Sequence, residues 1–367
     1  MPVTAPPYDA VVVGGGPAGL AAATWLARYR ARVLLLDAGE HRNRWVDQAH
    51  GYLGDDPLAP MELVARARRQ LAAYPEAEVR PGGARSARAV AEGGPFVLEL
   101  DGEPVDGTEV AGRRLVLATG VEDVFPEVGG FFEHYGASVF HCPTCDGYEA
   151  KGCAVVALGW SAELTGFALT LLGWAASVTV VTDGRRFEGD DAQRAELARA
   201  GIAVLEDDAV ELVGRRGGLE AVQLRNLGRI PCQLAFFSIA HHPRTDLARQ
   251  LGCALTAEGA IEVDDEAATS VPGVYAAGDV TPGLQLVQVA AAKGTIAGVA
   301  CAQSLRGTPS GMTDENRLDG SDLDDLQRDI DDVRDRVDDP LDQGDQMFID
   351  DGTRDTELTD DTIVPPG

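Results

Sequence analysis

The sequence contains little lysine, few cysteines and no long apolar run. Lys151 and Lys293 are the only lysines among 31 basic residues, and 59 acidic residues give a formal net charge of −28. Without a basic stripe, the chain is not expected to bind the phosphates of nucleic acids. No run of about 18 apolar residues could span a membrane, and six scattered cysteines are too few for a disulfide framework. Because no secretion signal is visible at the N-terminus, these absences predict a reducing, cytoplasmic setting.

Acidic residues are concentrated near the C-terminal end. Residues 308–367 hold 20 of the 59 acids and 5 of the 31 bases, which predicts an acidic, largely disordered tail. A short amphipathic helix is expected over about 321–338, before Pro340, because apolar residues recur there at spacings of three and four. This helix either docks on the body or on a partner, or it forms transiently in solvent. Its apolar residues are Leu323, Leu326, Ile330, Val333 and Val337.

Two segments of the chain each show a strand, a helix and a second strand in succession. Each begins with a buried apolar run and a Gly-containing turn, and continues with a helix rich in small and apolar residues. Two such βαβ units predict an α/β protein with two Rossmann-like, doubly wound, three-layer nucleotide-binding domains. The expected strands are 8–13, 32–36, 153–158 and 177–181, and the expected helices are 20–29 and 162–172.

The first βαβ unit carries a dinucleotide-binding pattern. Gly14-x-Gly16-x-x-Gly19 lies between the strand and the helix, and Asp37 ends the next strand. Gly14 allows the tight turn, Gly16 lets the backbone approach a pyrophosphate, and Gly19 lets helix and strand pack closely. The helix N-terminus would face the phosphates, and Asp37 would accept from a ribose hydroxyl. The alternative is a Gly-rich turn that binds no ligand.

A Cys-x-x-Cys pair is followed directly by an acid in Cys142-Pro143-Thr144-Cys145-Asp146-Gly147. This spacing is typical of thiol–disulfide chemistry, in which one thiolate attacks a partner disulfide and the second resolves the mixed disulfide. A zinc site would need two more ligands at suitable spacing, and none is evident, so no metal is predicted. We interpret the other four cysteines as buried apolar residues.

Four motifs, in this order, resemble those of the low-molecular-weight thioredoxin reductases, a family of flavoprotein disulfide reductases. The resemblance covers about residues 8–305. The motifs are Gly14-Gly15-Gly16-Pro17-Ala18-Gly19, Leu117-Ala118-Thr119-Gly120, Cys142-Pro143-Thr144-Cys145-Asp146-Gly147 and Ala276-Ala277-Gly278-Asp279.

The resemblance implies a discontinuous FAD-binding domain, about 1–118 and 246–307, with a pyridine-nucleotide-type domain at 119–245 inserted into it. The inserted domain carries the cysteine pair. Members of the family are usually homodimers, and the implied partner is a thioredoxin-like protein or a small disulfide or dithiol. The residues implied for FAD binding are Gly14, Gly16, Pro17, Ala18, Gly19, Asp37, Ala118, Thr119, Gly120, Gly278, Asp279, Gln288 and Val289.

The resemblance also implies a role for each residue of the redox motif. Cys145 would exchange electrons with the flavin, Cys142 would face the partner, and Asp146 would be the general acid and base for the thiols. His141 borders the pair and either lowers a thiol pKa or serves packing. The implied function is an FAD-dependent thiol–disulfide oxidoreductase that passes electrons between flavin, the Cys142–Cys145 disulfide and its substrate.

The second glycine motif departs from the family pattern. Ala157-Leu158-Gly159-Trp160-Ser161-Ala162 stands where Gly-x-Gly-x-x-Ala is expected, so a Cβ enters the tight turn and an indole lies near the pyrophosphate position. Thr182-Asp183-Gly184 replaces the His-Arg-Arg element that holds the 2′-phosphate of NADPH, and Asp183 would repel that phosphate. We therefore expect that NADPH is not an efficient donor. The electron donor stays unknown, and the deeply rooted, NADPH-site-deficient members of the family are the nearest match.

Two other functions stay open at this point. FAD-dependent dithiol oxidases, which pass electrons to oxygen, also lack a normal NADPH site, and residues 42–53 resemble both groups. In the oxidases a histidine commonly follows the second cysteine, whereas Asp146 stands here, as in the reductases. A non-enzymatic flavoprotein redox sensor, whose acidic tail recruits partners, is the third interpretation.

Overall fold

The computed structural model describes residues 8–102, 108–238 and 240–306. The predicted acidic tail and its helix at 321–338 lie outside the described residues. No helix within the described ranges is long and apolar enough to cross a membrane.

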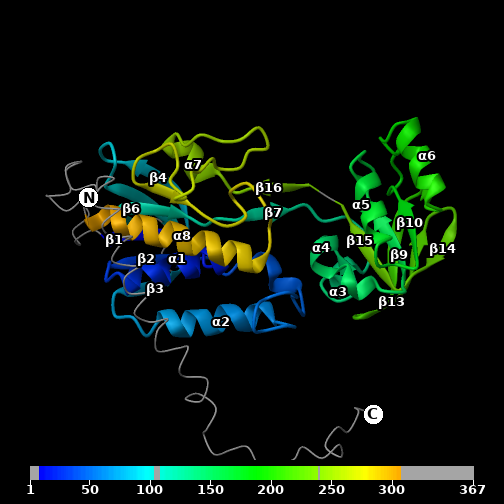
Figure 1. The fold of residues 1–367 in the computed structure, drawn as a ribbon, viewed down its shortest axis with the longest axis horizontal. Helices are drawn as coiled ribbons and strands as arrows, with labels where there is room; N and C mark the ends of the chain where they lie inside the picture. Colours follow the sequence, from blue (N-terminus) through cyan, green and yellow to red (C-terminus); the bar gives the residue numbers. More distant parts are fainter. Residues whose placement is uncertain (1–7, 103–107, 239, 307–367) are drawn as a thin grey trace, which may run out of the picture. The chain divides into compact units, whose positions relative to one another are not determined.

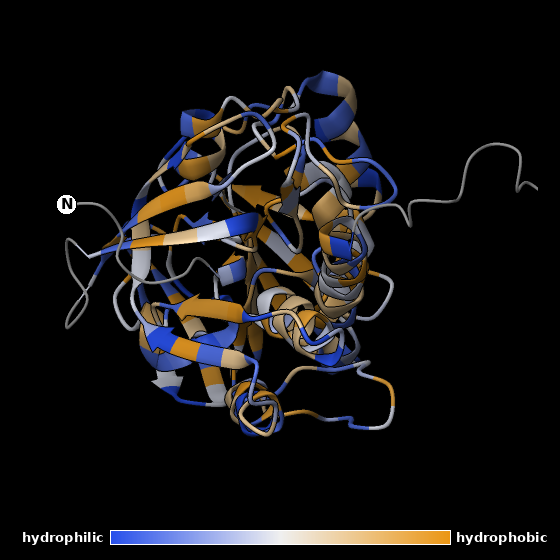
Figure 2. Cartoon of the chain, turned by 90° about the vertical axis from the view of Figure 1, so that its left-hand side faces the viewer, coloured by the Kyte–Doolittle hydropathy of each residue, from blue (hydrophilic) through white to orange (hydrophobic). Residues whose placement is uncertain are grey.

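The first sheet has seven strands, in the order β3-β2-β1-β6-β5-β4, and β17 also pairs with β6 (Figure 1). Strands β3, β2, β1, β6 and β17 run parallel, while β4 and β5 form an antiparallel extension. Several strands in Figure 2 carry orange, hydrophobic stretches. Hydrophobic residues dominate β1, β2 and β17, because both faces of this sheet are covered. The bounds are β1 (Tyr8–Val13), β2 (Val33–Asp37), β3 (Ala77–Pro81), β4 (Gly83–Ala89), β5 (Phe96–Asp101), β6 (Glu109–Leu117) and β17 (Val274–Ala276).

Small residues let two helices pack together beside this sheet. Helices α1 (Pro17–Arg28) and α8 (Val287–Arg306) run alongside each other (Figure 1). A Cβ on Gly294 would lie 2.0 Å from the carbonyl oxygen of Ala18. Only glycine permits this approach, which explains why both helices are rich in small residues. Two further helices, α2 (Pro60–Leu71) and α7 (Asp246–Leu251), complete this part of the fold.

The second sheet has five parallel strands, in the order β11-β10-β9-β15-β8. A separate three-stranded antiparallel sheet, β12-β13-β14, follows β11 in the chain. The strands are β8 (Val139–Phe140), β9 (Ala154–Leu158), β10 (Ser177–Val181), β11 (Ala203–Leu205), β12 (Ala209–Arg215), β13 (Gly218–Leu224), β14 (Gly228–Pro231) and β15 (Leu234–Phe237). The helices are α3 (Phe131–His134), α4 (Pro143–Asp146), α5 (Leu164–Leu171) and α6 (Asp191–Arg199).

An antiparallel pair of short strands joins the two halves of the fold. The chain leaves the first sheet through β7 (Val121–Asp123) and returns through β16 (His241–Pro243), which pairs with it. The second sheet therefore lies, in sequence, inside the elements of the first. This topology confirms the predicted α/β class with two Rossmann-like nucleotide-binding domains. The domain boundaries at 118/119 and 245/246 stay predictions.

Candidate active site

The first glycine loop combines two tight packing positions with one open position. Gly14 has a φ of +111°, and a Cβ there would lie 2.2 Å from the carbonyl oxygen of Ala118. A Cβ on Gly19 would lie 1.8 Å from the carbonyl oxygen of Gly14, whereas one on Gly16 would meet no protein atom within 4 Å. The fold therefore requires two of the glycines, and the third leaves open space at the N-terminus of α1. That space suits a pyrophosphate, which the helix dipole would attract.

Alanine variants of this loop should separate the two kinds of glycine. Gly19→Ala should lower the free energy of unfolding by about 3 kcal/mol, because its methyl group would collide with backbone. Gly16→Ala should leave the melting temperature of the cofactor-free protein unchanged and weaken flavin binding by about tenfold, because its methyl group would fill the cradle. Thermal unfolding and flavin titration measure the two effects. Equal destabilisation by both variants would contradict this division of roles.

Asp37, at the end of β2, is buried and already has several partners. Its carboxylate accepts from the backbone N–H of Gly39 at 2.7 Å, forms an ion pair with Arg68, and lies 3.7 Å from Nε2 of His41. A Cβ on Gly15 would lie 1.9 Å from Asp37 Oδ2, so glycine is required beside this carboxylate. Sequence patterns gave no signal for Arg68 or His41, because α2 and a loop bring them to the site. Asp37 lines the same cavity as the glycine loop.

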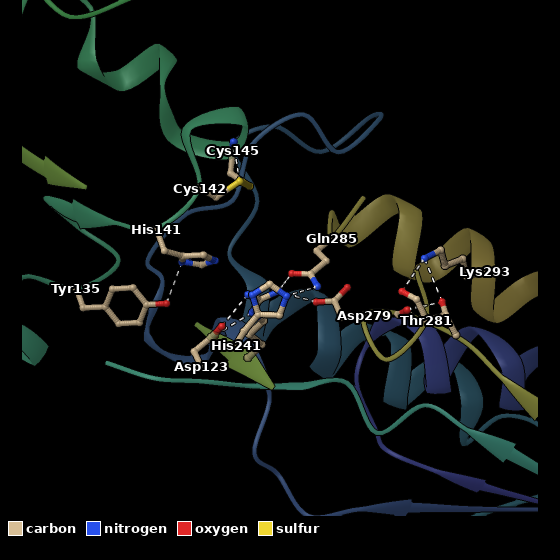
Figure 3. A network of polar contacts seen from close by, with 12 residues as sticks. Asp123, Tyr135, His141, Cys142, Cys145, His241, Asp279, Thr281, Gln285 and Lys293 are labelled. Atoms are coloured by element: carbon tan, nitrogen blue, oxygen red, sulfur yellow. Dashed lines mark hydrogen bonds and ion pairs between the residues drawn. A yellow bond between two sulfur atoms is a disulfide. The ribbon is translucent and has the colours of Figure 1, made fainter. Parts of the chain in front are cut away.

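A partly buried arginine that also lines this cavity connects three segments of the chain. Arg42 donates from Nε and Nη2 to Asp123 at 2.9 and 2.7 Å, and from Nη1 to Asp279 at 2.9 Å and Gln285 at 2.7 Å. Gln285 in turn contacts Nε2 of His241 at 3.1 Å, as drawn in Figure 3. Although burial opposes the charge of Arg42, the hydrogen bonds and charges of Asp123 and Asp279 raise its pKa. Asp279, a predicted flavin contact, is therefore fixed in place by this network.

A lysine on α8 donates hydrogen bonds to the turn that follows Asp279. Nζ of Lys293 donates to the carbonyl oxygen of Pro282 at 2.7 Å and to Oγ1 of Thr281 at 3.1 Å (Figure 3). Burial lowers the pKa of Lys293. These bonds brace the turn that follows Asp279.

The redox motif forms a short helix that begins at the first cysteine. Cys142 caps α4, and its Sγ accepts from the backbone N–H of Cys145 at 3.1 Å. The two sulfur atoms are joined in a disulfide (Figure 3). A Cβ on Gly147 would lie 2.6 Å from the ring of Trp174, so glycine is needed where the motif packs against that indole.

One cavity brings most of the predicted site residues together. It is lined by both the first glycine loop and the redox motif, although these are more than 120 positions apart in the sequence. Gly19, Val289 and Cys142 do not line it. The predicted residues that do are Gly14, Gly16, Pro17, Ala18, Asp37, Ala118, Thr119, Gly120, Cys145, Asp146, Gly278, Asp279 and Gln288.

The carboxyl group of Asp146 is the ionisable group best matched to proton transfer near the disulfide. Burial, followed by the charge of Glu149, raises its pKa to about 7, while His50 acts in the opposite direction. Burial, followed by the charge of Arg42, lowers the pKa of His141 to about 4. His141 is therefore neutral at neutral pH, and its Nδ1 contacts the hydroxyl of Tyr135 at 3.2 Å. Asp146 can both take and return a proton near pH 7.

Comparison with known proteins identifies the family. A family model for the pyridine nucleotide-disulphide oxidoreductases matches residues 8–294. The chain belongs to this family. A thioredoxin reductase from Gibberella zeae is 31% identical over 339 residues, which cover 81% of this chain and 98% of that relative. The chain is therefore a flavin disulfide oxidoreductase of the thioredoxin reductase type, as the four motifs predicted.

Solved structures of similar sequence have the same fold. The crystal structure of HlmI matches with a TM-score of 0.76 and 33% identity, covering 82% of this chain and 93% of HlmI. An oxidoreductase from Agrobacterium tumefaciens matches with a TM-score of 0.72 and 35% identity, covering 82% of this chain and 99% of that protein.

The second glycine loop of this pyridine nucleotide-disulphide oxidoreductase is held by contacts with the segment that follows β10. After β9 the chain turns at Gly159, and the guanidinium of Arg185 lies 3.9 Å from the ring centroid of Trp160. The backbone N–H of Glu188 donates to the carbonyl oxygen of Trp160 at 2.8 Å, which fixes the loop. Asp183 has a φ of +53° and accepts from the backbone N–H of Ala209 at 3.2 Å. Arg185, two positions after Asp183, is thus stacked on the indole.

The remaining cysteines are poorly suited to redox chemistry. Cys232, Cys253 and Cys301 are buried, and burial raises the pKa of Cys232 and Cys301 to about 12. Cys153 is partly exposed. Across the described ranges, no group of three or more His, Cys, Asp or Glu side chains is arranged to hold a metal ion.

Proposed function

We propose that this protein is an FAD-dependent thiol–disulfide oxidoreductase acting on a thioredoxin-type protein or a small disulfide. The observation that supports this most is the single cavity lined by the first glycine loop together with Cys145 and Asp146. The open position at Gly16, the helix N-terminus and Asp37 fit the pyrophosphate and ribose of FAD. When bound, FAD would supply two-electron transfer to or from the disulfide. The FAD-binding domain would be residues 1–118 and 246–307, and the inserted domain 119–245.

The two cysteines have different surroundings, and this supports different roles for them. Cys145 lines the cavity and would be the sulfur that exchanges electrons with the cofactor, whereas Cys142 does not line it and would meet the partner. The Cys142 thiolate attacks one sulfur of the substrate disulfide, and the other substrate sulfur leaves and takes a proton. Cys145 then attacks Cys142, which restores the enzyme disulfide and releases the substrate as a dithiol. Asp146 holds the proton that moves between these sulfurs.

We further propose that NADPH is not an efficient electron donor, although the family is named for pyridine nucleotides. The stacking of Arg185 on Trp160, and the acid at position 183, support this proposal. To bind a 2′-phosphate, the Arg185 guanidinium would have to leave the indole, and the phosphate would also approach the carboxylate of Asp183. The physiological donor stays open. From the sequence resemblance we retain a cytoplasmic homodimer as a prediction.

Anaerobic mixing of the oxidised flavoprotein with candidate donors should reveal the donor. We expect bleaching of the flavin absorbance by NADPH or NADH to be at least about a hundredfold slower than by a small dithiol or a reduced ferredoxin-type carrier. Trp160→Ala should accelerate the NADPH reaction if the indole blocks the site. Rapid bleaching of the unmodified protein by NADPH would contradict the proposal.

The same preparation tests the two competing functions. Oxygen consumption with a small dithiol in air, without any other donor, would favour a dithiol oxidase over a reductase. A redox sensor would show slow, single reduction without turnover on any donor and acceptor pair.

A further inference from the structure

A histidine held between two carboxylates lies beside the redox motif. Nδ1 of His50 lies 3.1 Å from Oδ1 of Asp56, and Nε2 of His50 lies 3.4 Å from Oε1 of Glu149. The second oxygen of Asp56 accepts from the backbone N–H of Gly51 at 3.1 Å. The imidazole is therefore fixed at both nitrogens, and the bond to Asp56 turns Nε2 toward Glu149.

This group lies beside both the cavity and the redox motif. His50 lines the cavity together with Cys145 and Asp146, and the carbonyl oxygen of Gly51 accepts from Nε2 of Gln288 at 3.1 Å. Glu149 lies in the 3-10 helix η2 (Tyr148–Ala150), which follows α4 directly. Its Oε2 atom is buried and, among the described residues, has no hydrogen-bond partner. This oxygen therefore has room for a further hydrogen-bond donor.

The charged groups that act on Asp146 have opposite effects. The charge of Glu149 raises the pKa of Asp146, and His50 lowers it. Tyr135 also interacts with Asp146 and stays protonated, because burial raises the pKa of its phenol. Neighbouring His141 is neutral at neutral pH, so His50 is the histidine that acts on Asp146.

Reduction of the disulfide requires that Asp146 be reprotonated in each cycle. Converting Cys142–Cys145 to two thiols consumes two electrons and two protons; the reduced flavin of the proposed function would supply both electrons and one proton, and the second proton would come through Asp146. Asp146 is only 8% exposed and can supply one proton before it must be recharged. The side chains of His50 and Asp56 are 26% and 50% exposed, so they can exchange protons with solvent.

We propose that His50, oriented by Asp56, forms with Glu149 a relay that returns protons from solvent to Asp146. This inference rests on the proposed function, because it assigns Asp146 to the thiols. The proton passes from solvent to His50, from His50 to Glu149 and from Glu149 to Asp146, and it travels in reverse when the dithiol closes. His50 and Glu149 are positioning residues that act through Asp146.

The pH dependence of thiol alkylation tests the relay without requiring turnover. The cysteine pair is reduced chemically, the reductant is removed, and the rate of iodoacetamide modification is followed by mass spectrometry between pH 5 and 9. The inflection that disappears in Asp146→Asn belongs to Asp146. We expect Glu149→Gln to move this inflection to lower pH by about one unit, and His50→Gln to move it to higher pH by a similar amount.

A control variant and a measurement of disulfide turnover complete the test of the relay. Glu133→Gln removes an exposed carboxylate on α3 and should leave the inflection in place. His50→Gln should also slow disulfide turnover above the inflection by about tenfold, with partial rescue by added imidazole. Shifts of His50→Gln and Glu149→Gln in the same direction, or no larger than that of Glu133→Gln, would overturn the relay. If the shifts occur as expected but the unmodified protein turns over no disulfide or dithiol, the proposed function fails instead.

Discussion

Serine in place of Cys145 should lower the turnover of any disulfide or dithiol substrate by about a thousandfold or more. Cys142–Cys145 is the only disulfide among the described residues, and Cys145 is the sulfur that lines the cavity. Without it, electrons have no thiol through which to pass between the cofactor and the partner. Steady-state turnover with a small disulfide, or oxygen uptake with a small dithiol, measures the loss.

The same substitutions test which cysteine meets the partner. In Cys145→Ser, the remaining Cys142 should form a mixed disulfide with a substrate that stays trapped, because no resolving thiol is present. Cys142→Ser should accumulate much less of this adduct. Cys153→Ser removes a partly exposed free thiol and should keep full turnover. A stable adduct on Cys145 but not on Cys142 would reverse the assignment of the two sulfurs.

Asp146→Asn should slow thiol turnover by about a hundredfold while the flavin remains bound. The amide has nearly the same shape as the carboxyl group but cannot exchange a proton with the sulfurs.

Although Asp146→Asn slows turnover, it should make the folded protein more stable above neutral pH. Since burial raises the pKa of Asp146 to about 7, the folded protein holds this proton more tightly than the unfolded chain does.

This difference gives the stability effect a defined pH window. The contribution of the protonated carboxyl is fully present below the ordinary Asp pKa of 3.8 and is lost as pH rises toward 7, a change of about 4 kcal/mol at most. Asp146→Asn should therefore melt at a higher temperature than the unmodified protein at pH 8, with little difference at pH 4. Thermal unfolding at the two pH values checks this. A variant that is slower and also less stable at pH 8 would indicate a structural role only.

The regular elements could be predicted where one local pattern dominated. The run of buried residues at 8–13 matches β1, and the strand expected at 177–181 matches β10. Helix α1 begins at Pro17 rather than at residue 20, because proline suits the first helical position although it stands inside the glycine motif. The glycine spacing was informative because backbone contacts of Gly14 and Gly19 demand it.

Contacts between distant segments could not be predicted. Arg68 reaches Asp37, at the end of β2, from helix α2, and Arg42 joins segments that are up to 243 positions apart. The pairing of His50 with Glu149 depends on the redox motif and the loop after the 3-10 helix η1 (Arg42–Trp45) meeting in three dimensions. Trp160 stood out in the sequence as a bulky residue in the second loop, but its stacking with Arg185 required the fold. Such partners are set by tertiary packing, which leaves no periodic trace in the chain.

The scarcity of lysine has a practical consequence for attaching this protein to a surface. The amine of Lys293 is held by Thr281 and Pro282, so of the two lysines amine-directed coupling would proceed mainly through exposed Lys151. Lys151 follows η2 and lies only a few residues beyond the redox motif. A sensor chip prepared through amines would therefore present part of the protein with its redox motif against the matrix. Coupling through the carboxylates of the acidic C-terminal segment would place the anchor in a different part of the chain.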